Sequence, residues 1–171
     1  AIRGPRARWR SVPKILSDMP LSLRPKPADN PLTSCNNNCT RGLTICGNAP
    51  TTAGDDAQAE VGGFIYGGSN AADNSGSINY LVIKGTGAQI NADSQYNGIS
   101  FYAVGSGTTL ENISVIDGAD DGVEFFGGTV AVSNMYLENN DDDSIDWTEG
   151  WSGSVTNAYI SHTIPGFSTV F

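Results

Sequence analysis

The sequence predicts an all-β domain in which short parallel strands wind into a coil, preceded by an extended N-terminal arm. Three observations predict this fold. An Asn recurs at one place in four similar segments, apolar residues alternate with polar ones after it, and a second set of aligned segments shows the same alternation with aromatic residues. The chain has 171 residues, enough for one domain with a substantial core.

The first set of segments aligns on an Asn column. "SINYLVIKG", "LENISVIDG", "VSNMYLENN" and "VTNAYISHT" place Asn79, Asn112, Asn134 and Asn157 in register. The first and third residues after each Asn are apolar, which is the period of two of a half-buried strand. We therefore expect these residues to face inward: Tyr80 and Val82, Ile113 and Val115, Met135 and Leu137, Ala158 and Ile160. Stacked Asn amides can bond one another, as buried amides require.

The second set, "NGISFY", "DGVEFF" and "DSIDWT", aligns Ile99 with Val123 and Ile145, and Phe101 with Phe125 and Trp147. A polar column of Ser100, Glu124 and Asp146 lies between them. A repeat of about 22–24 residues with two or three short strands is one turn of a β-solenoid, and stacked turns are needed to bury its inner face. The polar insertion at 85–95 lengthens the first repeat.

The charge distribution separates an arm from the domain. We expect residues 1–40 to form a basic, Pro-rich arm and residues 41–171 to form the coil. Residues 1–41 hold eight of the nine Lys and Arg residues, whereas the remainder has Lys84 against sixteen acids, a net charge of −15. A domain with this much negative charge repels phosphate backbones, which argues against nucleic-acid binding. The sequence also lacks the ~20 consecutive apolar residues of a membrane-spanning helix.

Three cysteines, Cys35, Cys39 and Cys46, are clustered at the end of the arm. A zinc site would lack its fourth ligand, because the single His162 is distant in the sequence. One disulfide with one free thiol suits an exported protein better.

Several long segments resemble a known group of proteins. "GLTICGNAP", "YGGSNAADNSGSINYLVI", "NGISFYAVGSGTTLENISVIDGADDGVEFFGGTV" and "DDDSIDWTEGWSGSV" are similar to bacterial exported proteins of the outer membrane or cell surface. Members of this group are often lipoproteins and mostly of unassigned activity. The resemblance covers residues 41–171. It implies a right-handed parallel β-helix that is secreted or held at the cell surface.

Paired acids occur twice, in "DDGVEFF" and "DDSIDWT". In a coil they stack in adjacent columns, and like charges on neighbouring strands destabilise each other. Calcium is the natural counter-charge, since it prefers six to eight oxygen ligands. The alternative is a set of solvated acidic turns. The candidate calcium ligands are Asp120, Asp121, Glu124, Asp142, Asp143 and Asp146.

Aromatic residues near the same turns are candidates for sugar binding. Trp151 is expected at a turn, where its indole could stack on a sugar ring. Tyr102 and Phe126 are expected to face outward and could line the same surface. The alternative for Trp151 is packing in the core or turn, and Trp147 is expected in the core column.

The sequence argues against catalysis. Lyases of the resembled fold generally use an Arg or Lys base beside calcium, and its hydrolases pair acids with a His and an Arg–Lys segment. Here Lys84 is the single base after residue 41, and His162 is isolated in the sequence. We therefore expect a non-catalytic extracellular structural or adhesive protein, forming a homo-oligomer or filament through coil ends and the basic arm. The alternative is a polysaccharide-binding or polysaccharide-degrading module.

Overall fold

The computed structural model of the protein describes residues 39–60, 62–91 and 94–163. These residues form strands and turns, so the predicted all-β class is confirmed. Within the described ranges, nothing forms a helix long and apolar enough to cross a membrane. The expected arm, with Cys35, lies outside the described residues.

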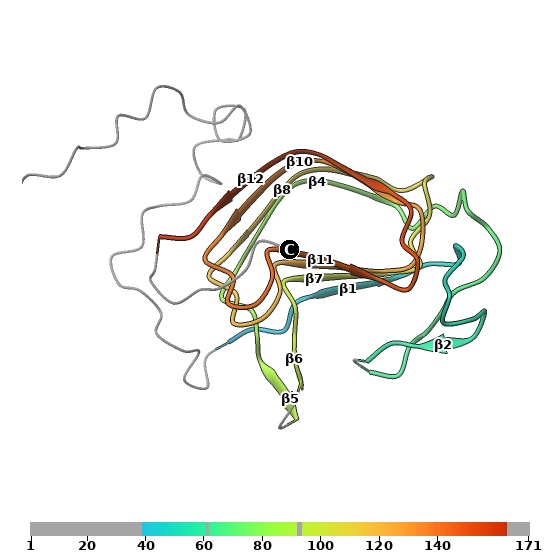
Figure 1. Ribbon diagram of the computed structural model, residues 1–171, viewed down its shortest axis with the longest axis horizontal. Helices are drawn as coiled ribbons and strands as arrows, with labels where there is room; N and C mark the ends of the chain where they lie inside the picture. Colours follow the sequence, from blue (N-terminus) through green and yellow to red (C-terminus); the bar gives the residue numbers. More distant parts are fainter. Residues whose placement is uncertain (1–38, 61, 92–93, 164–171) are drawn as a thin grey trace, which may run out of the picture.

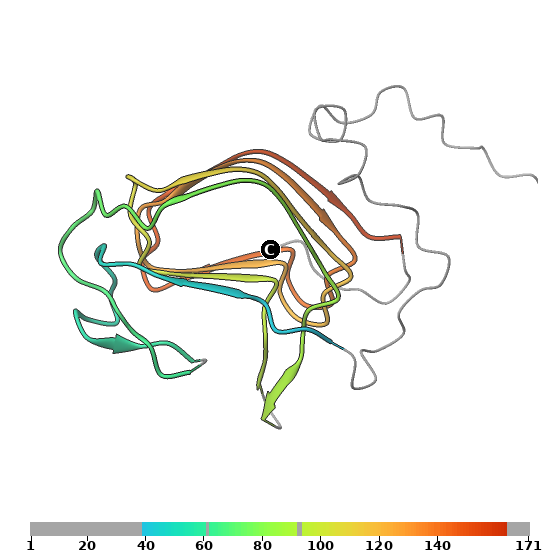
Figure 2. The same cartoon turned by 180° about the vertical axis from the view of Figure 1, so that it is seen from behind.

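Two four-stranded parallel sheets face each other (Figures 1 and 2). The short-strand sheet contains, in spatial order, β1 (Leu43–Cys46), β7 (Ile99–Tyr102), β9 (Val123–Phe126) and β11 (Ile145–Thr148). The long-strand sheet contains β4 (Ser77–Lys84), β8 (Thr109–Ile116), β10 (Ala131–Glu138) and β12 (Ser154–Ser161). From β7 onward, successive strands alternate between the sheets, so the chain winds as the predicted coil of parallel strands.

Each long strand bends at one residue with left-handed backbone. Asn112, Asn134 and Asn157 have φ angles of 55°, 61° and 59°, a region that Asn tolerates better than most residues. Their side chains form the predicted ladder. Asn112 donates to Asn79 at 2.8 Å, Asn134 to Asn112 at 3.1 Å, and Asn157 to Asn134 at 3.2 Å. The bends and the ladder therefore come from the same residues.

The register of β4 differs from the prediction by one residue. The left-handed position of β4 is Tyr80 rather than Asn79, and Leu81 pairs with Ile113. Leu81 and Ile83 pack on the core, whereas Tyr80 is 38% exposed and Val82 packs on the outer side. A shift of one residue in a strand exchanges its two faces. The Asn alignment was misleading because the Asn79 side chain reaches the ladder from the residue before the bend.

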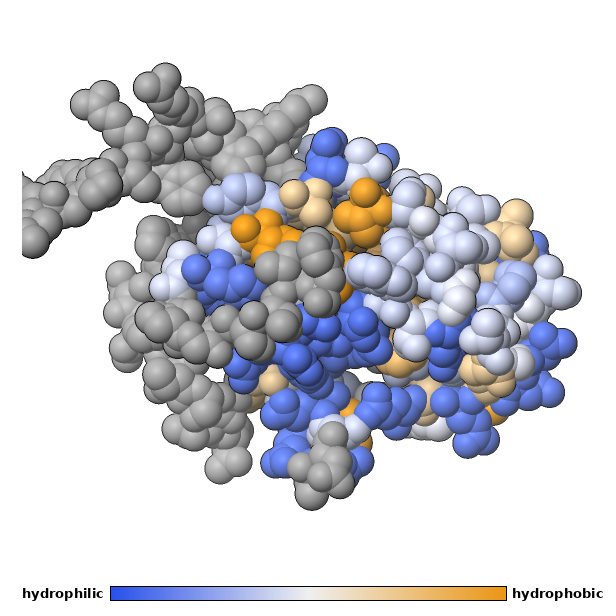
Figure 3. All heavy atoms as spheres, viewed as in Figure 1, coloured by the Kyte–Doolittle hydropathy of each residue, from blue (hydrophilic) through white to orange (hydrophobic). Residues whose placement is uncertain are grey.

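The main core lies between the sheets and includes a stack of aromatic rings. Phe125 is fully buried, with its ring centroid 5.3 Å from Phe101 and 4.4 Å from Trp151. The expected position of Trp147 in the core is therefore wrong. Trp147 pairs with Phe125 through the backbone, but its side chain is 50% exposed at the β11 end of the coil. Trp151, from the following turn, occupies the position over Phe125. At this end, Figure 3 shows apolar side chains between the sheets, surrounded by hydrophilic ones.

Two hairpins interrupt the coil and project from the same side of it (Figure 1). The first pairs β2 (Ala57–Gln58) with β3 (Ile65–Tyr66), and the second pairs β5 (Gln89–Asn91) with β6 (Ser94–Gln95). The second lies in the insertion found in the sequence at 85–95. The hairpins are the main departure from regular coil geometry.

The first hairpin covers part of the outer face of the short-strand sheet. Tyr102 is 1% exposed and Phe126 9% exposed, with their rings 4.1 Å apart. Tyr66 of β3 lies 4.8 Å from Tyr102, and its hydroxyl donates to Glu149 at 2.9 Å. Tyr102 and Phe126 do face away from the coil interior. Their predicted role as ligand-binding residues is wrong, however, because the hairpin buries them in a second apolar cluster.

The cysteines differ in state. Cys39 is disulfide-bonded, and Cys46 is a free thiol packed against the second cluster. Burial raises the pKa of the Cys46 thiol, which keeps it protonated.

We expect Phe125→Ala to lower the free energy of unfolding by ~3–5 kcal/mol, because it removes the middle ring of the stack and leaves a cavity. Chemical denaturation of the purified protein measures this loss. Trp147→Ala is the control and should cost less than half as much, since that side chain is half exposed. Equal losses would contradict the position assigned to Phe125.

We expect Asn112→Gly to destabilise the protein by about 2 kcal/mol, because Asn112 makes two ladder bonds worth about 1 kcal/mol each. Asn112→Ala should cost roughly 1 kcal/mol more than the Gly variant, because only Gly adopts a φ of +55° without strain. Asn157→Gly, at the exposed end of the ladder, should cost less than Asn112→Gly. Thermal melts of the three variants measure their destabilisation. Equal melting temperatures for Asn112→Gly and Asn157→Gly would contradict a contribution of the ladder.

Candidate functional site

A cleft of about 430 Å³ lies on the outer face of the short-strand sheet and is lined in part by residues of both hairpins. Its lining is polar and comes from four parts of the chain: Glu60 from the first hairpin; Gln89, Ser94 and Gln95 from the second; Asn97 and Glu124 at or before the short strands; and Asp120, Asp121 and Asp142 from two stacked turns. Glu60 accepts a hydrogen bond from the Ser94 hydroxyl, so the two hairpins meet at the cleft.

The stacked turns that carry the aspartates are closely packed. One connects β8 to β9 and the next connects β10 to β11, and Asn140 of the second accepts a hydrogen bond from the Gly118 amide of the first at 3.2 Å. A Cβ atom at Gly122 would lie 2.6 Å from the Ser144 carbonyl oxygen and from the Asn140 side chain. Glycine at 122 therefore allows one turn to lie directly against the next, which brings their acids together.

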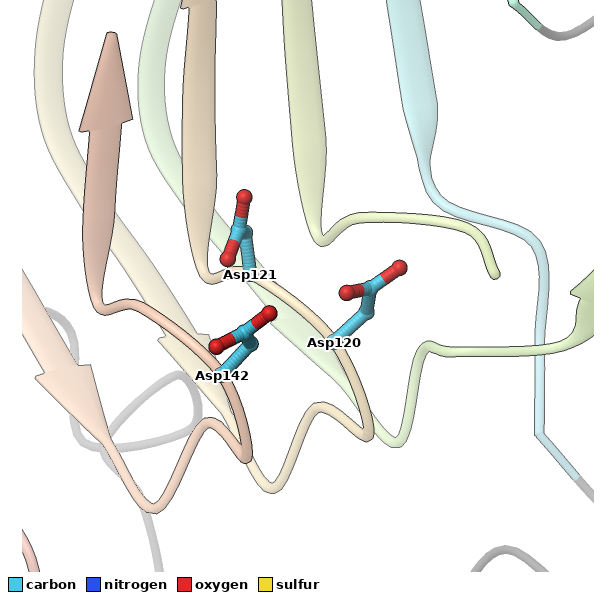
Figure 4. A group of neighbouring side chains, drawn as sticks. All are labelled: Asp120, Asp121 and Asp142. Carbon is cyan, nitrogen blue, oxygen red and sulfur yellow. The ribbon is translucent and has the colours of Figure 1, made fainter. Parts of the chain in front are cut away.

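The carboxylates form two groups that share Asp121. One contains Asp120, Asp121 and Asp142, which come together from the adjacent turns in Figure 4. The other contains Asp121, two residues before β9, together with Glu124 and Asp146, the second residues of β9 and β11. Within each group, one oxygen from every carboxylate lies within 4.8 Å of the others.

Hydrogen bonds from neutral donors satisfy part of this negative charge. The Asn97 side-chain amide donates to Glu124 at 2.5 Å and to the Ser100 hydroxyl at 3.2 Å. The backbone amide of Asp143 donates to Asp121 at 2.9 Å. Arg41 and Lys84 are the two Lys or Arg residues in the described ranges, and neither lines the cleft. The charge of the cleft is therefore not neutralised by a described basic side chain.

Burial raises the pKa of three of these acids. The pKa of Glu124 rises to about 9, first through burial and then through the charges of Asp121 and Asp146. Burial, followed by the neighbouring carboxylates, raises the pKa of Asp121 to about 7 and that of Asp120 to about 6. Hydrogen bonds from Asn97 and from backbone amides oppose the shifts without cancelling them. The metal-free cleft therefore retains protons near neutral pH.

Five of the six acids proposed from the sequence belong to these groups: Asp120, Asp121, Glu124, Asp142 and Asp146. Asp143 contributes its backbone amide to Asp121, and neither group found among the described residues contains its carboxylate. The expectation that Trp151 forms a sugar platform is not supported, because one ring face stacks on Phe125 and its indole nitrogen donates to the Val130 carbonyl at 3.2 Å.

The two hairpins and the segment before β7 contribute further cleft residues, which were not among those expected from the sequence. Asn97 could have been found, because "NGISFY" aligns it with Asp121 and Asp143. Glu60, Gln89, Ser94 and Gln95 could not, because they lie outside the repeat. Their positions depend on how the hairpins fold back over the sheet.

Comparison with known families agrees with this fold. The profile of a family described as a pectate-lyase-like β-helix domain matches residues 30–168. No curated protein and no solved structure matches the chain significantly. Because the match spans most of the sequence, the chain belongs to the pectate-lyase-like β-helix family.

Proposed function

We propose that this chain is an extracellular polysaccharide-binding module that holds calcium in its acidic cleft and binds acidic polysaccharides through that ion. The observation that carries the proposal is the pair of carboxylate groups sharing Asp121 in an open polar cleft. The family supports a polysaccharide ligand, and its members are typically extracellular. This proposal takes up the alternative function expected from the sequence.

The donor set fits calcium. Calcium binds oxygen ligands at about 2.3–2.6 Å, so two of its ligands can lie up to ~5 Å apart. The carboxylate oxygens of each group fall within 4.8 Å, and neither group contains the nitrogen or sulfur ligands that zinc prefers. Calcium would supply the positive charge that the described cleft residues lack. Binding would release the protons that Asp121 and Glu124 retain, because a carboxyl group coordinates calcium only in its ionised form.

Charge also indicates the class of ligand. An anionic polymer is repelled by the cleft alone, whereas a bound calcium ion with open coordination positions can accept a sugar carboxylate. The side-chain amides of Gln89 and Gln95 and the hydroxyl of Ser94 offer hydrogen-bond partners for sugar hydroxyls. A polymer of uronic acids combines the two requirements.

The placement of the basic residues in the described ranges favours a binding role over a lyase reaction, in which a base removes a proton from the sugar. Lys84 lies 3.6 Å from Asp117, and Arg41 lies over the Tyr96 ring at 5.6 Å. Neither residue lines the cleft, so no described Lys or Arg side chain is placed there to remove a proton from a sugar.

A second candidate function, glycoside hydrolysis, is favoured by Glu124 and Asp146. Glu124 retains its proton at neutral pH, and one of its oxygens lies within 4.8 Å of an Asp146 oxygen. Retaining glycosidases use a protonated and an ionised carboxyl group roughly 5–5.5 Å apart. Release of reducing ends from a polysaccharide, abolished by Glu124→Gln, would establish hydrolysis in place of binding alone.

Without calcium, we expect stability to fall as pH rises from 5 to 8. In the unfolded chain these acids lose their protons near pH 4, whereas in the folded chain Asp121 and Glu124 retain them to about 7 and 9. The folded state thus binds more protons in this window, and the free energy of unfolding decreases by about 1.4 kcal/mol per pH unit for each proton that it retains. Denaturation in chelator at several pH values measures this slope.

Glu124→Gln should flatten that slope, because glutamine can still accept the Asn97 hydrogen bond but carries no charge. Glu111→Gln, on the other sheet, is the control and should leave the slope unchanged. A wild-type protein more stable at pH 8 than at pH 5 would show that the cluster does not retain its protons.

We expect calcium to raise the melting temperature at pH 7.5 and to permit binding of an oligogalacturonate. Ligand binding to the folded state stabilises it, by roughly 2.7 kcal/mol at a concentration a hundred times the dissociation constant. The double variant Asp121→Asn/Asp142→Asn should lose both effects. Isothermal titration with calcium alone, and then with the oligogalacturonate, measures them separately.

Asp55→Asn/Asp56→Asn is the matched control, since both acids are exposed outside the cleft lining. A neutral cello-oligosaccharide is the control ligand. Calcium binding that survives in the cleft variant, or equal binding of both sugars, would contradict the proposed role of the acids.

A further inference from the structure

Phe64 is a large apolar side chain in an unusual position. It is 58% exposed, although it lies on the face of the first hairpin that turns toward the coil. Residues directly opposite in an antiparallel pair share a face of the sheet. The Ala59 amide donates to the Phe64 carbonyl at 2.8 Å, which extends the β2–β3 ladder by one pair, and Ala59 is buried against the second apolar cluster.

The neighbouring pairs confirm which face this is. Tyr66 pairs with Ala57 and packs on Tyr102, whereas Ile65 pairs with Gln58 and both of these side chains are exposed. Side chains alternate along a strand, so Phe64 faces the coil as Tyr66 does. Tyr66 finds an aromatic partner there, and Phe64 does not bury its ring to the same extent. Phe64 therefore extends past the covered apolar cluster.

In the first hairpin, Phe64 lies between Tyr66 and the tip; the cleft lining includes the tip but not Phe64 itself. Glu60, at the tip of the same hairpin, lines the cleft and contacts Ser94 of the second hairpin. Along the short-strand sheet, Tyr66 covers Tyr102 and Phe126, and the cleft residue Glu124 precedes Phe126 by two positions. Moving from Tyr66 through Phe64 to Glu60, the hairpin thus passes from the buried aromatic pair to the cleft lining.

The ring is also held in place by the chain. A Cβ atom at Gly62 would lie 2.5 Å from the Phe64 ring, so the ring rests against the bare Gly62 backbone. Gly62 has a φ of +74°, which disfavours other residues. One side of the ring is therefore supported while more than half of the side chain remains open to solvent.

We propose that Phe64 is the stacking subsite of the cleft, on which one pyranose ring of the bound polysaccharide lies while its neighbour engages the acid groups. This inference rests on the proposed function. One face of a pyranose ring carries mainly C–H groups, and burying it against an aromatic ring gains apolar contact that the polar lining cannot provide. Phe64 adds orientation and affinity for sugars, and the carboxylates provide the ion.

The test compares Phe64→Ala with Ile65→Ala, its equally exposed neighbour on the other face of the hairpin, at 54% exposure. Titration with a defined oligogalacturonate in saturating calcium should show binding weakened about three- to tenfold by Phe64→Ala. Ile65→Ala should not weaken it. Phe64→Tyr should retain binding, whereas Phe64→Leu, apolar but not planar, should behave as the Ala variant does. Calcium affinity should be the same in all four variants.

Two further measurements separate the possible failures. Melting temperatures identify a variant that has lost its fold. NMR of the wild-type protein then gives a second test, because the Phe64 ring protons must shift when the oligogalacturonate binds. Unshifted ring protons, or equal affinities for the Ala variants at 64 and 65, would overturn the subsite while leaving the proposed function intact. Absence of oligogalacturonate binding to the wild-type protein would overturn both.

Discussion

Parallel stacking in register is the constraint on which the rest of this structure depends. Each coil places its residues about 4.8 Å from the equivalent residues of the next, so every column brings like side chains together. For Asn112 and Asn134 this is favourable, because an amide both donates and accepts. For Phe101 and Phe125 it is favourable as well, because the rings stack. For carboxylates the same geometry is unfavourable.

The acidic cleft forms because stacking in register also brings acidic side chains of neighbouring coils together. Asp121, Glu124 and Asp146 come close because their turns and strands stack, and burial then makes their charges more costly. The free energy lost there is offset elsewhere in the same coils, by the aromatic stack and the Asn ladder. A regular coil can therefore tolerate one unfavourable column. That column is where a cation or a proton has the most to contribute.

Sequence periodicity predicted the parts of the fold that repeat. The columns of Val123, Phe125 and Glu124 could be assigned because alternation and repeat length agree over several coils. The prediction failed at the ends and beyond the repeat. Leu81, and not Tyr80, faces inward, because Asn79 precedes the bend of its strand whereas Asn112 lies at the bend. Both can join the ladder, so aligning the two Asn residues shifted the predicted register by one. Trp151 replaced Trp147 over Phe125, because the indole from the following turn stacks on that ring.

The hairpins explain why the site was only half predictable. The repeat supplies the acids, and their column could be read from "DDGVEFF" and "DDSIDWT". The hairpins supply the rest, and no repeat constrains them. The first hairpin buries Tyr102, which alternation alone places in solvent, and leaves Phe64 open although its face is the covered one. An insertion thus reverses the exposure that periodicity predicts. In a coil of this kind, such reversals are the positions at which to look for a binding surface.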